Sequence, residues 1–65
     1  MSTIVAQRAI DKLSEGIVCK DYWMILKAYE MVENEWFSWD KVPDSYYEKW
    51  EKLTDKANNM LNDRI

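Results

Sequence analysis

The sequence predicts an all-α fold, a small antiparallel three-helix unit that self-associates. Apolar residues return every three or four positions in three segments, no segment alternates as a strand does, and the connections are short. The chain has 65 residues, and a chain of that length buries only about 60% of the surface that its unfolded form exposes. We therefore expect one helical domain, residues 1–65, held by dense aromatic packing, by self-association or by both.

The first helix is predicted over residues 3–15. Ser2 or Thr3 can cap its start by accepting hydrogen bonds from free backbone N–H groups. Its apolar residues recur on one side at helical spacing: Val5, Ala6, Ala9, Ile10, Leu13 and Ile17. Gly16, the only glycine, predicts the end of this helix, because glycine readily takes the left-handed conformation that follows many helices.

The second helix is predicted over residues 20–37 and carries two neighbouring apolar stripes. The first stripe contains Tyr22, Ile25, Leu26, Tyr29, Val32 and Trp36. The second contains Met24, Ala28 and Met31. A helix with so wide an apolar side must contact two neighbours, so we expect it to be the central element of the fold.

The second stripe is also the predicted surface for self-association, most simply as a symmetric dimer. One small bundle offers few neighbours to cover Met24, Ala28 and Met31, and a contiguous exposed apolar patch usually marks a contact surface. The alternative is that the first helix covers the whole stripe.

The third helix is predicted over residues 43–63. Pro43 suits a first helical turn because it lacks an N–H and has a fixed φ, and Asp44 places negative charge near the positive end of the helix dipole. Its apolar stripe alternates steps of four and three residues: Tyr46, Trp50, Leu53, Ala57 and Met60. The opposite face is polar, so it is either solvated or a polar contact surface.

Residues 34–50 contain six of the nine aromatic side chains, which form either a core or a surface that binds a partner. Four of them fall on or beside the predicted apolar stripes and are expected to pack: Trp36, Tyr46, Tyr47 and Trp50. Phe37 and Trp39 fall in the turn between the second and third helices. They either plug the open end of the bundle, the interpretation we favour, or stay exposed.

Trp23 is different, because it lies among polar residues on the second helix. A lone exposed tryptophan lowers solubility unless something covers it, and buried tryptophans dominate the energetics of protein contacts. The predicted partner-binding residues combine such aromatic anchors with acidic neighbours: Trp23, Glu33, Glu35, Trp39 and Asp40. They would suit an apolar pocket bordered by lysine or arginine.

The sequence contains no signal for a catalytic, cofactor-binding or metal-ligating residue. With no histidine, Cys-His and Ser-His catalysis are excluded, and the single Cys19 argues against a structural zinc site. One glycine cannot build a glycine-rich phosphate loop. Carboxylate pairs such as Glu51 and Asp55 lie on faces that the periodicity leaves in water, without the burial that acid–base catalysis uses. We expect no enzymatic activity and no cofactor.

The net charge of −3 is unevenly spread along the chain. Residues 1–29 contain four basic and three acidic side chains, whereas residues 30–65 contain five basic and nine acidic ones. Such a surface repels phosphate, so we expect no direct nucleic-acid binding. No apolar run approaches the length of a membrane helix, and the lone cysteine fits a reducing compartment, so we expect a cytoplasmic protein.

These observations predict a small non-enzymatic module that binds a larger protein partner and inhibits or modulates it, as small phage and mobile-element proteins do. One alternative is an acidic nucleic-acid mimic that blocks a nucleic-acid-binding enzyme, although several lysines interrupt the acidic run. Its acidic residues would be Asp44, Glu48, Glu51 and Asp55. Another is a modulator of a DNA-binding protein complex. The order of helix lengths resembles that of the Hha-type nucleoid modulators, but no motif matches, so no residue role is carried over.

Overall fold

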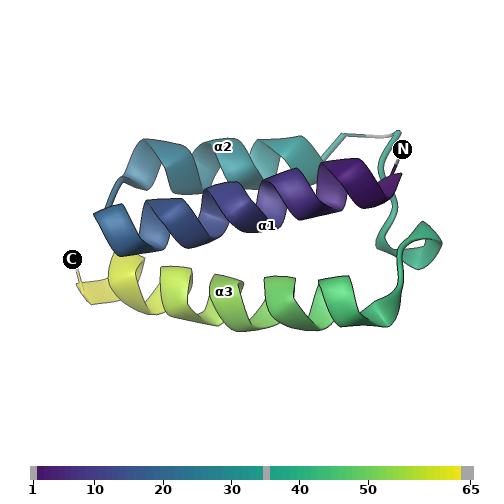
Figure 1. Cartoon of the computed structure of the whole chain (residues 1–65). Coiled ribbons are helices and arrows are strands. Elements are labelled where there is room, and N and C mark those ends of the chain that lie inside the picture. Colours follow the sequence, from purple (N-terminus) through teal and green to yellow (C-terminus); the bar gives the residue numbers. More distant parts are fainter. Residues whose placement is uncertain (1, 35, 64–65) are drawn as a thin grey trace.

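The computed structural model describes residues 2–34 and 36–63 and has three α-helices and one short 3₁₀ helix (Figure 1). The helices are α1 (Ser2–Cys19), α2 (Tyr22–Val32), η1 (Trp39–Lys41) and α3 (Asp44–Asp63). The described residues include no strand, so the predicted all-α fold is confirmed. No helix within these two ranges is long and apolar enough to cross a membrane.

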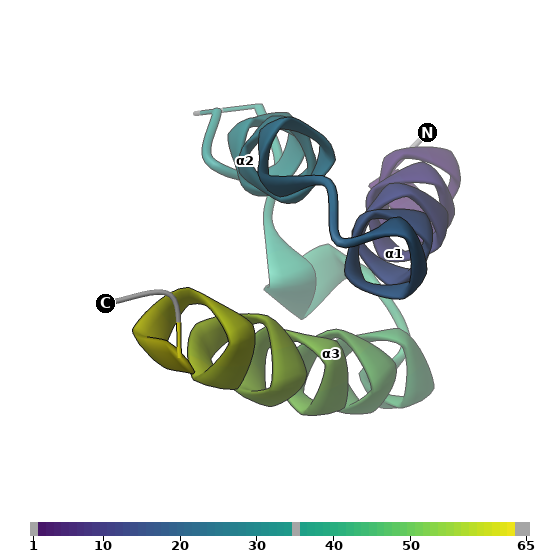
Figure 2. The same cartoon turned by 90° about the vertical axis from the view of Figure 1, so that its left-hand side faces the viewer.

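The helix α1 packs against both of the other α-helices. In Figure 1, α1 and α2 lie side by side and run in opposite directions, and Figure 2 shows α3 passing below both at an angle. Among the described elements, α1 is the helix whose backbone lies close to both of the others. The expectation that the second helix is central was therefore wrong. Its apolar width is real, but α2 has only 11 residues and faces mainly α1.

The close contact of α1 with α2 depends on Gly16. This residue is buried within α1 rather than at its end, and a Cβ added to it would lie 3.0 Å from both Ile25 Cγ1 and Met24 Cβ. Cβ atoms essentially never approach heavy atoms more closely than this, so a glycine lets the two backbones come together. The prediction that Gly16 ends the first helix was wrong, because its absent side chain serves packing instead.

Lys20, directly after α1, takes the left-handed conformation that was expected of Gly16. Its φ of 54° is left-handed, and its N–H donates to the Ile17 carbonyl at 3.2 Å. The Asp21 N–H donates to the Gly16 carbonyl at 2.8 Å. These two bonds satisfy two of the last four carbonyls of α1 in the manner of a Schellman motif. Two residues therefore complete the reversal into α2.

The helix α2 ends at Val32, five residues earlier than predicted. The Asn34 side chain accepts a hydrogen bond from the Trp36 backbone N–H at 2.8 Å, which favours a turn over a continued helix. Trp36 consequently leaves the apolar stripe and is 84% exposed. Its predicted packing role was wrong.

The core lies where the three helices meet. Its buried residues are Ala9, Ile10, Leu13, Ile25, Ala28, Trp50 and Ala57. Trp39 packs against this core from η1, with its ring centroid 5.5 Å from that of Trp50 and 5.4 Å from that of Tyr47. Phe37 meets Trp39 edge-on at 4.9 Å. The interpretation of Trp39 and Phe37 as a plug is thus the one that the structure adopts.

Candidate functional site

Trp23 lies in the first turn of α2 and is 76% exposed. The Asp21 carboxylate accepts hydrogen bonds from the backbone N–H groups of Trp23, at 3.1 Å, and Met24, at 3.3 Å. At 100° per residue, Trp23 lies on the side of α2 away from the fully buried Ile25 and Ala28. The Asp21 cap therefore fixes the backbone at Trp23, and the indole lies on the solvent side of α2.

Leu26 extends this exposed apolar surface by one turn. It is 47% exposed, a large value for a leucine, and residues three apart are neighbours on a helix surface. Lys27 and Glu30 are also exposed on this side of α2 and place one charge of each sign beside the two apolar groups. We call Trp23, Leu26, Lys27 and Glu30 the α2 outer face. It combines an aromatic anchor with a charged border.

Three other predicted partner-binding residues, Glu33, Trp39 and Asp40, lie at the far end of the molecule. Glu33 is exposed just beyond α2, and Asp40 is exposed in η1. In Figure 1 the α1–α2 turn, beside which Trp23 lies, and η1 are at opposite ends of a molecule that extends 35 Å along its long axis. One small pocket on a partner cannot contact both ends. Glu35 lies outside the described residues.

Trp39 and Asp40 contribute to a shallow hollow at this far end. Asp44 and Tyr47 from the start of α3 complete its lining. The Ser38 hydroxyl accepts a hydrogen bond from the Asp40 N–H at 3.3 Å and caps η1. Aromatic rings beside two carboxylates attract cationic side chains. Trp39 is half-buried and packs on the core, so it has a structural role, and its partner-binding role stays a prediction.

The predicted self-association stripe is covered by α1. Ala28 has no exposed surface, and Met31 packs against the core and borders a hollow with Arg8 and Glu15 of α1. Met24 is half-buried, with its Cβ close to Gly16. The alternative in which the first helix covers this stripe is the arrangement found here, because Gly16 admits α2 so closely.

Four exposed apolar side chains were not predicted to be exposed: Val18, Leu26, Trp36 and Tyr47. Trp36 was assigned to packing because the predicted helix continued through it, and Val18, 79% exposed, lies beyond the predicted end of the first helix. The Asn34 that precedes Trp36 was the available signal, since asparagine favours turns over helix interiors.

Within the described ranges, no three histidine, cysteine, aspartate or glutamate side chains are grouped so that they could hold a metal ion. Burial raises the pKa of Tyr29 above its usual value of 10.0, and this tyrosine packs against the core. Comparisons with family models, curated proteins and solved structures find no match to this chain.

Proposed function

We propose that this protein is a non-enzymatic binding module that occupies a larger protein partner through the α2 outer face and thereby inhibits or modulates it. The observation that carries the proposal is the exposure of Trp23 on a helix whose backbone is fixed by the Asp21 cap. Burying one well-placed tryptophan in a partner's pocket commonly contributes 2 kcal/mol or more to binding, on the order of a 30-fold change in affinity.

The short turn between α1 and α2 supports this role by preorganising the anchor. The Lys20 bond to Ile17 and the Asp21 bonds to Trp23 and Met24 fix the start of α2 before any partner arrives. Binding then costs less ordering of the backbone, which raises affinity for a given contact area. The charged Lys27 and Glu30 beside the anchor would set orientation and encounter rate.

Affinity capture from the native host at near-physiological salt, followed by mass spectrometry, tests the proposal. We expect a discrete protein to be retained by the natural chain and lost with Trp23→Ala. Ile4→Ser is the matched control, because Ile4 is an exposed apolar residue, 57% accessible, near the other end of α1. Retention of no protein by the natural chain, or equal retention by Trp23→Ala, would contradict the proposal.

Self-association remains a prediction, and the α2 outer face is now the surface that would carry it. Trp23 and Leu26 would face their equivalents across a two-fold axis, since a symmetric dimer uses the same patch on both chains. Sedimentation equilibrium at tens of micromolar protein measures this directly. A mass of 7.9 kDa at all concentrations would contradict self-association, and Leu26→Glu should abolish a dimer if one forms.

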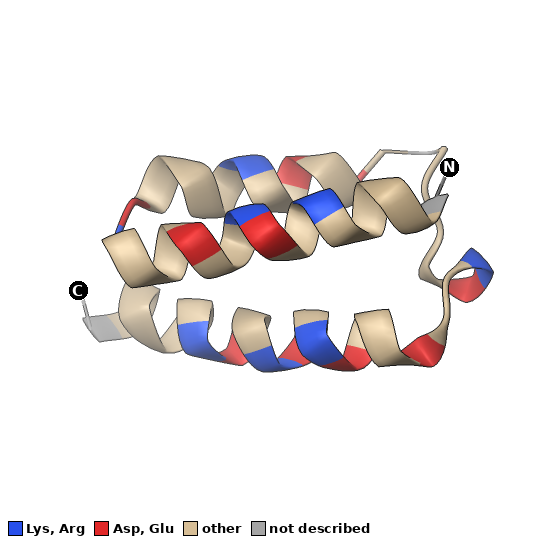
Figure 3. Cartoon of the chain, in the orientation of Figure 1, with Lys and Arg blue, Asp and Glu red and all other residues tan. Residues whose placement is uncertain are grey.

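A nucleic-acid mimic stays a second candidate function, because the acidic and basic side chains of α3 lie on different sides of the helix. At 100° per residue, Asp44, Glu48, Glu51 and Asp55 share one side of the helix, all exposed, whereas three lysines lie on the side toward α1. Figure 3 shows acidic and basic segments alternating along the α3 ribbon. The lysines therefore interrupt the acidic row in sequence but not on the helix surface. Binding by this row would weaken steeply with salt and tolerate Trp23→Ala.

The lone Cys19 is exposed and free, which suits a reducing compartment. We expect the module to meet its partner in the cytoplasm.

A further inference from the structure

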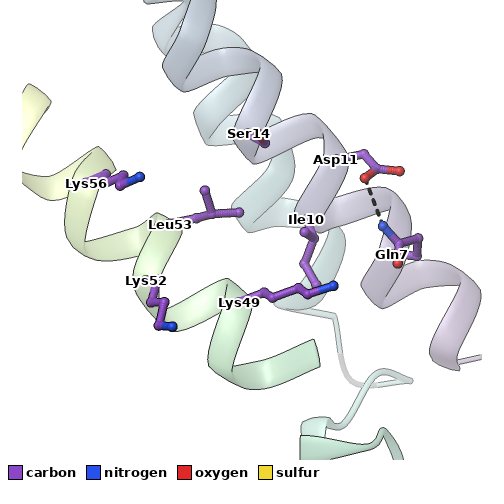
Figure 4. A pocket seen from close by; sticks show the side chains of 8 residues that line it. All are labelled: Gln7, Ile10, Asp11, Ser14, Lys49, Lys52, Leu53 and Lys56. Atoms are coloured by element: carbon purple, nitrogen blue, oxygen red, sulfur yellow. Dashed lines mark hydrogen bonds between the residues drawn. The ribbon is translucent and has the colours of Figure 1, made fainter. Parts of the chain in front are cut away.

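A groove between α1 and α3 is lined on one side by a row of lysines (Figure 4). Lys49, Lys52 and Lys56 repeat at i, i+3 and i+7, a spacing that places them on one side of α3. In Figure 4, Lys49 extends toward Ile10 of α1, and Leu53 points into the space between the two helices. The groove therefore has an apolar floor and a basic wall.

The lining of this groove has more basic than acidic side chains. Asp11 is the one carboxylate in the lining, and it already accepts a hydrogen bond from Gln7 Nε2 at 2.8 Å. In the part of the chain that the structure describes, none of the three lysines forms an ion pair. The lining therefore contains three lysines and one carboxylate, in a protein whose net charge is −3. An acidic ligand would relieve the repulsion among the lysines.

The apolar floor and the borders of the groove select among acidic ligands. Ile10 is 5% exposed and Leu53 is half-buried, so apolar side chains form the bottom of the groove beside the lysines. A phosphate group gains nothing from contact with such apolar side chains. Glu48 and Glu51 lie exposed on α3 next to the lysine row and would repel a wide polyanion such as a duplex laid across it. A single helix with carboxylates and one apolar side chain avoids both difficulties.

We propose that this groove binds an acidic amphipathic helix of a protein partner. Its carboxylates contact Lys49, Lys52 and Lys56, and its apolar side chain rests between Ile10 and Leu53. This mode of recognition places an amphipathic helix in a groove formed by two other helices. The groove lies between α1 and α3, away from Trp23 on α2, so its binding does not depend on the α2 outer face.

The test is an NMR titration of the labelled full chain with a synthetic helical peptide. Its glutamates repeat at i, i+3 and i+7 with a leucine at i+4, and a matched peptide has glutamine in place of each glutamate. We expect the acidic peptide to shift amide signals of α1 and α3 around Ile10 and Leu53, and Lys49→Glu or Lys56→Glu to weaken binding by about tenfold or more. Lys41→Glu in η1, an exposed lysine outside the groove, is the control of equal charge change and should retain binding.

Circular dichroism of each variant confirms that the helices persist, and Lys49→Gln, which introduces no new charge, should weaken binding by a smaller factor. Equal binding of the glutamine peptide would overturn the proposal. So would retained affinity in both lysine-to-glutamate variants. Tighter binding of a single-stranded or duplex oligonucleotide than of the acidic peptide, at the same groove signals, would assign the groove to nucleic acid and also overturn it.

Discussion

Tyr29 of α2 meets Trp50 of α3 edge-on, with ring centroids 5.8 Å apart and ring planes at 78°. This contact joins α2 to α3, and Trp50 also stacks obliquely on Trp39 of η1 at 5.5 Å. Edge-to-face aromatic pairs contribute about 0.5–1.5 kcal/mol beyond the area they bury. Trp50 is therefore the residue through which α2, η1 and α3 share one core.

Replacing Trp50 by alanine should lower the free energy of unfolding by about 3–5 kcal/mol, because Trp50 is 7% exposed and the change removes an indole from the core. In a chain this small, such a loss leaves little folded protein at room temperature. Trp36→Ala is the matched control and should change stability by less than about 0.5 kcal/mol, since Trp36 is 84% exposed. Urea unfolding followed by circular dichroism measures both, and equal losses in the two variants would show that the core is placed wrongly.

Gly16→Ala should destabilise the protein even though alanine is the better helix former. The new methyl group would lie 3.0 Å from Ile25 Cγ1 and Met24 Cβ, so α1 and α2 must separate. Overpacking of this kind typically costs about 1–3 kcal/mol, which exceeds the roughly 0.5–1 kcal/mol gained in helix propensity. Glu15→Ala, at an exposed position of the same helix, should be neutral or slightly stabilising. A gain in stability for Gly16→Ala would disprove the close approach of α1 and α2.

Lys20→Gly should raise the free energy of unfolding by about 1 kcal/mol, because a left-handed lysine carries a steric cost that glycine does not. A glycine introduced inside α1 should instead lower the free energy of unfolding. Glu15→Gly should lower stability by about 1 kcal/mol. Chemical denaturation of both variants checks this pair, and a loss of stability in Lys20→Gly would contradict the left-handed ending of α1.

Stability should fall at high pH partly through Tyr29. Burial raises its pKa in the folded state above the usual 10.0, so the folded chain holds the phenolic proton more tightly than the unfolded chain does. This contribution is fully present below pH 10 and is lost as the pH rises through the folded-state pKa. Unfolding free energies measured from pH 9 upward should therefore decline less steeply in Tyr29→Phe than in the natural chain. The same decline in both proteins would show that Tyr29 does not contribute to the loss of stability at high pH.

The sequence predicted the helices well where apolar spacing decided the outcome, and less well where single backbone positions did. The stripe of Tyr46, Trp50 and Ala57 identified the packing side of α3, because an amphipathic helix has few ways to bury its apolar side. Gly16 and Lys20 were misjudged together. Composition alone does not distinguish a glycine required by a close neighbour from one required by a left-handed φ, and the neighbour becomes visible only in three dimensions.

The candidate site was predicted in part for similar reasons. Trp23 could be singled out because its neighbours on the helix are polar, and the structure leaves it exposed. Its separation from Trp39 and Asp40 depends on the length of α2 and on the reversal at Lys20, which no local pattern reveals. The lysine groove was missed because Lys49 and Glu48 are adjacent in sequence yet fall on different sides of α3.

Photo-crosslinking in the native host tests the binding role of Trp23 most directly. A photoreactive benzoyl-phenylalanine placed at position 23 keeps an aromatic group on the α2 outer face. The same residue at position 4, which is also exposed but lies on α1, provides the control. We expect position 23 to give a discrete covalent adduct with a larger protein and position 4 to give none. If position 23 yields only free protein, or the same adducts as position 4, Trp23 does not anchor a partner and the proposed function is wrong.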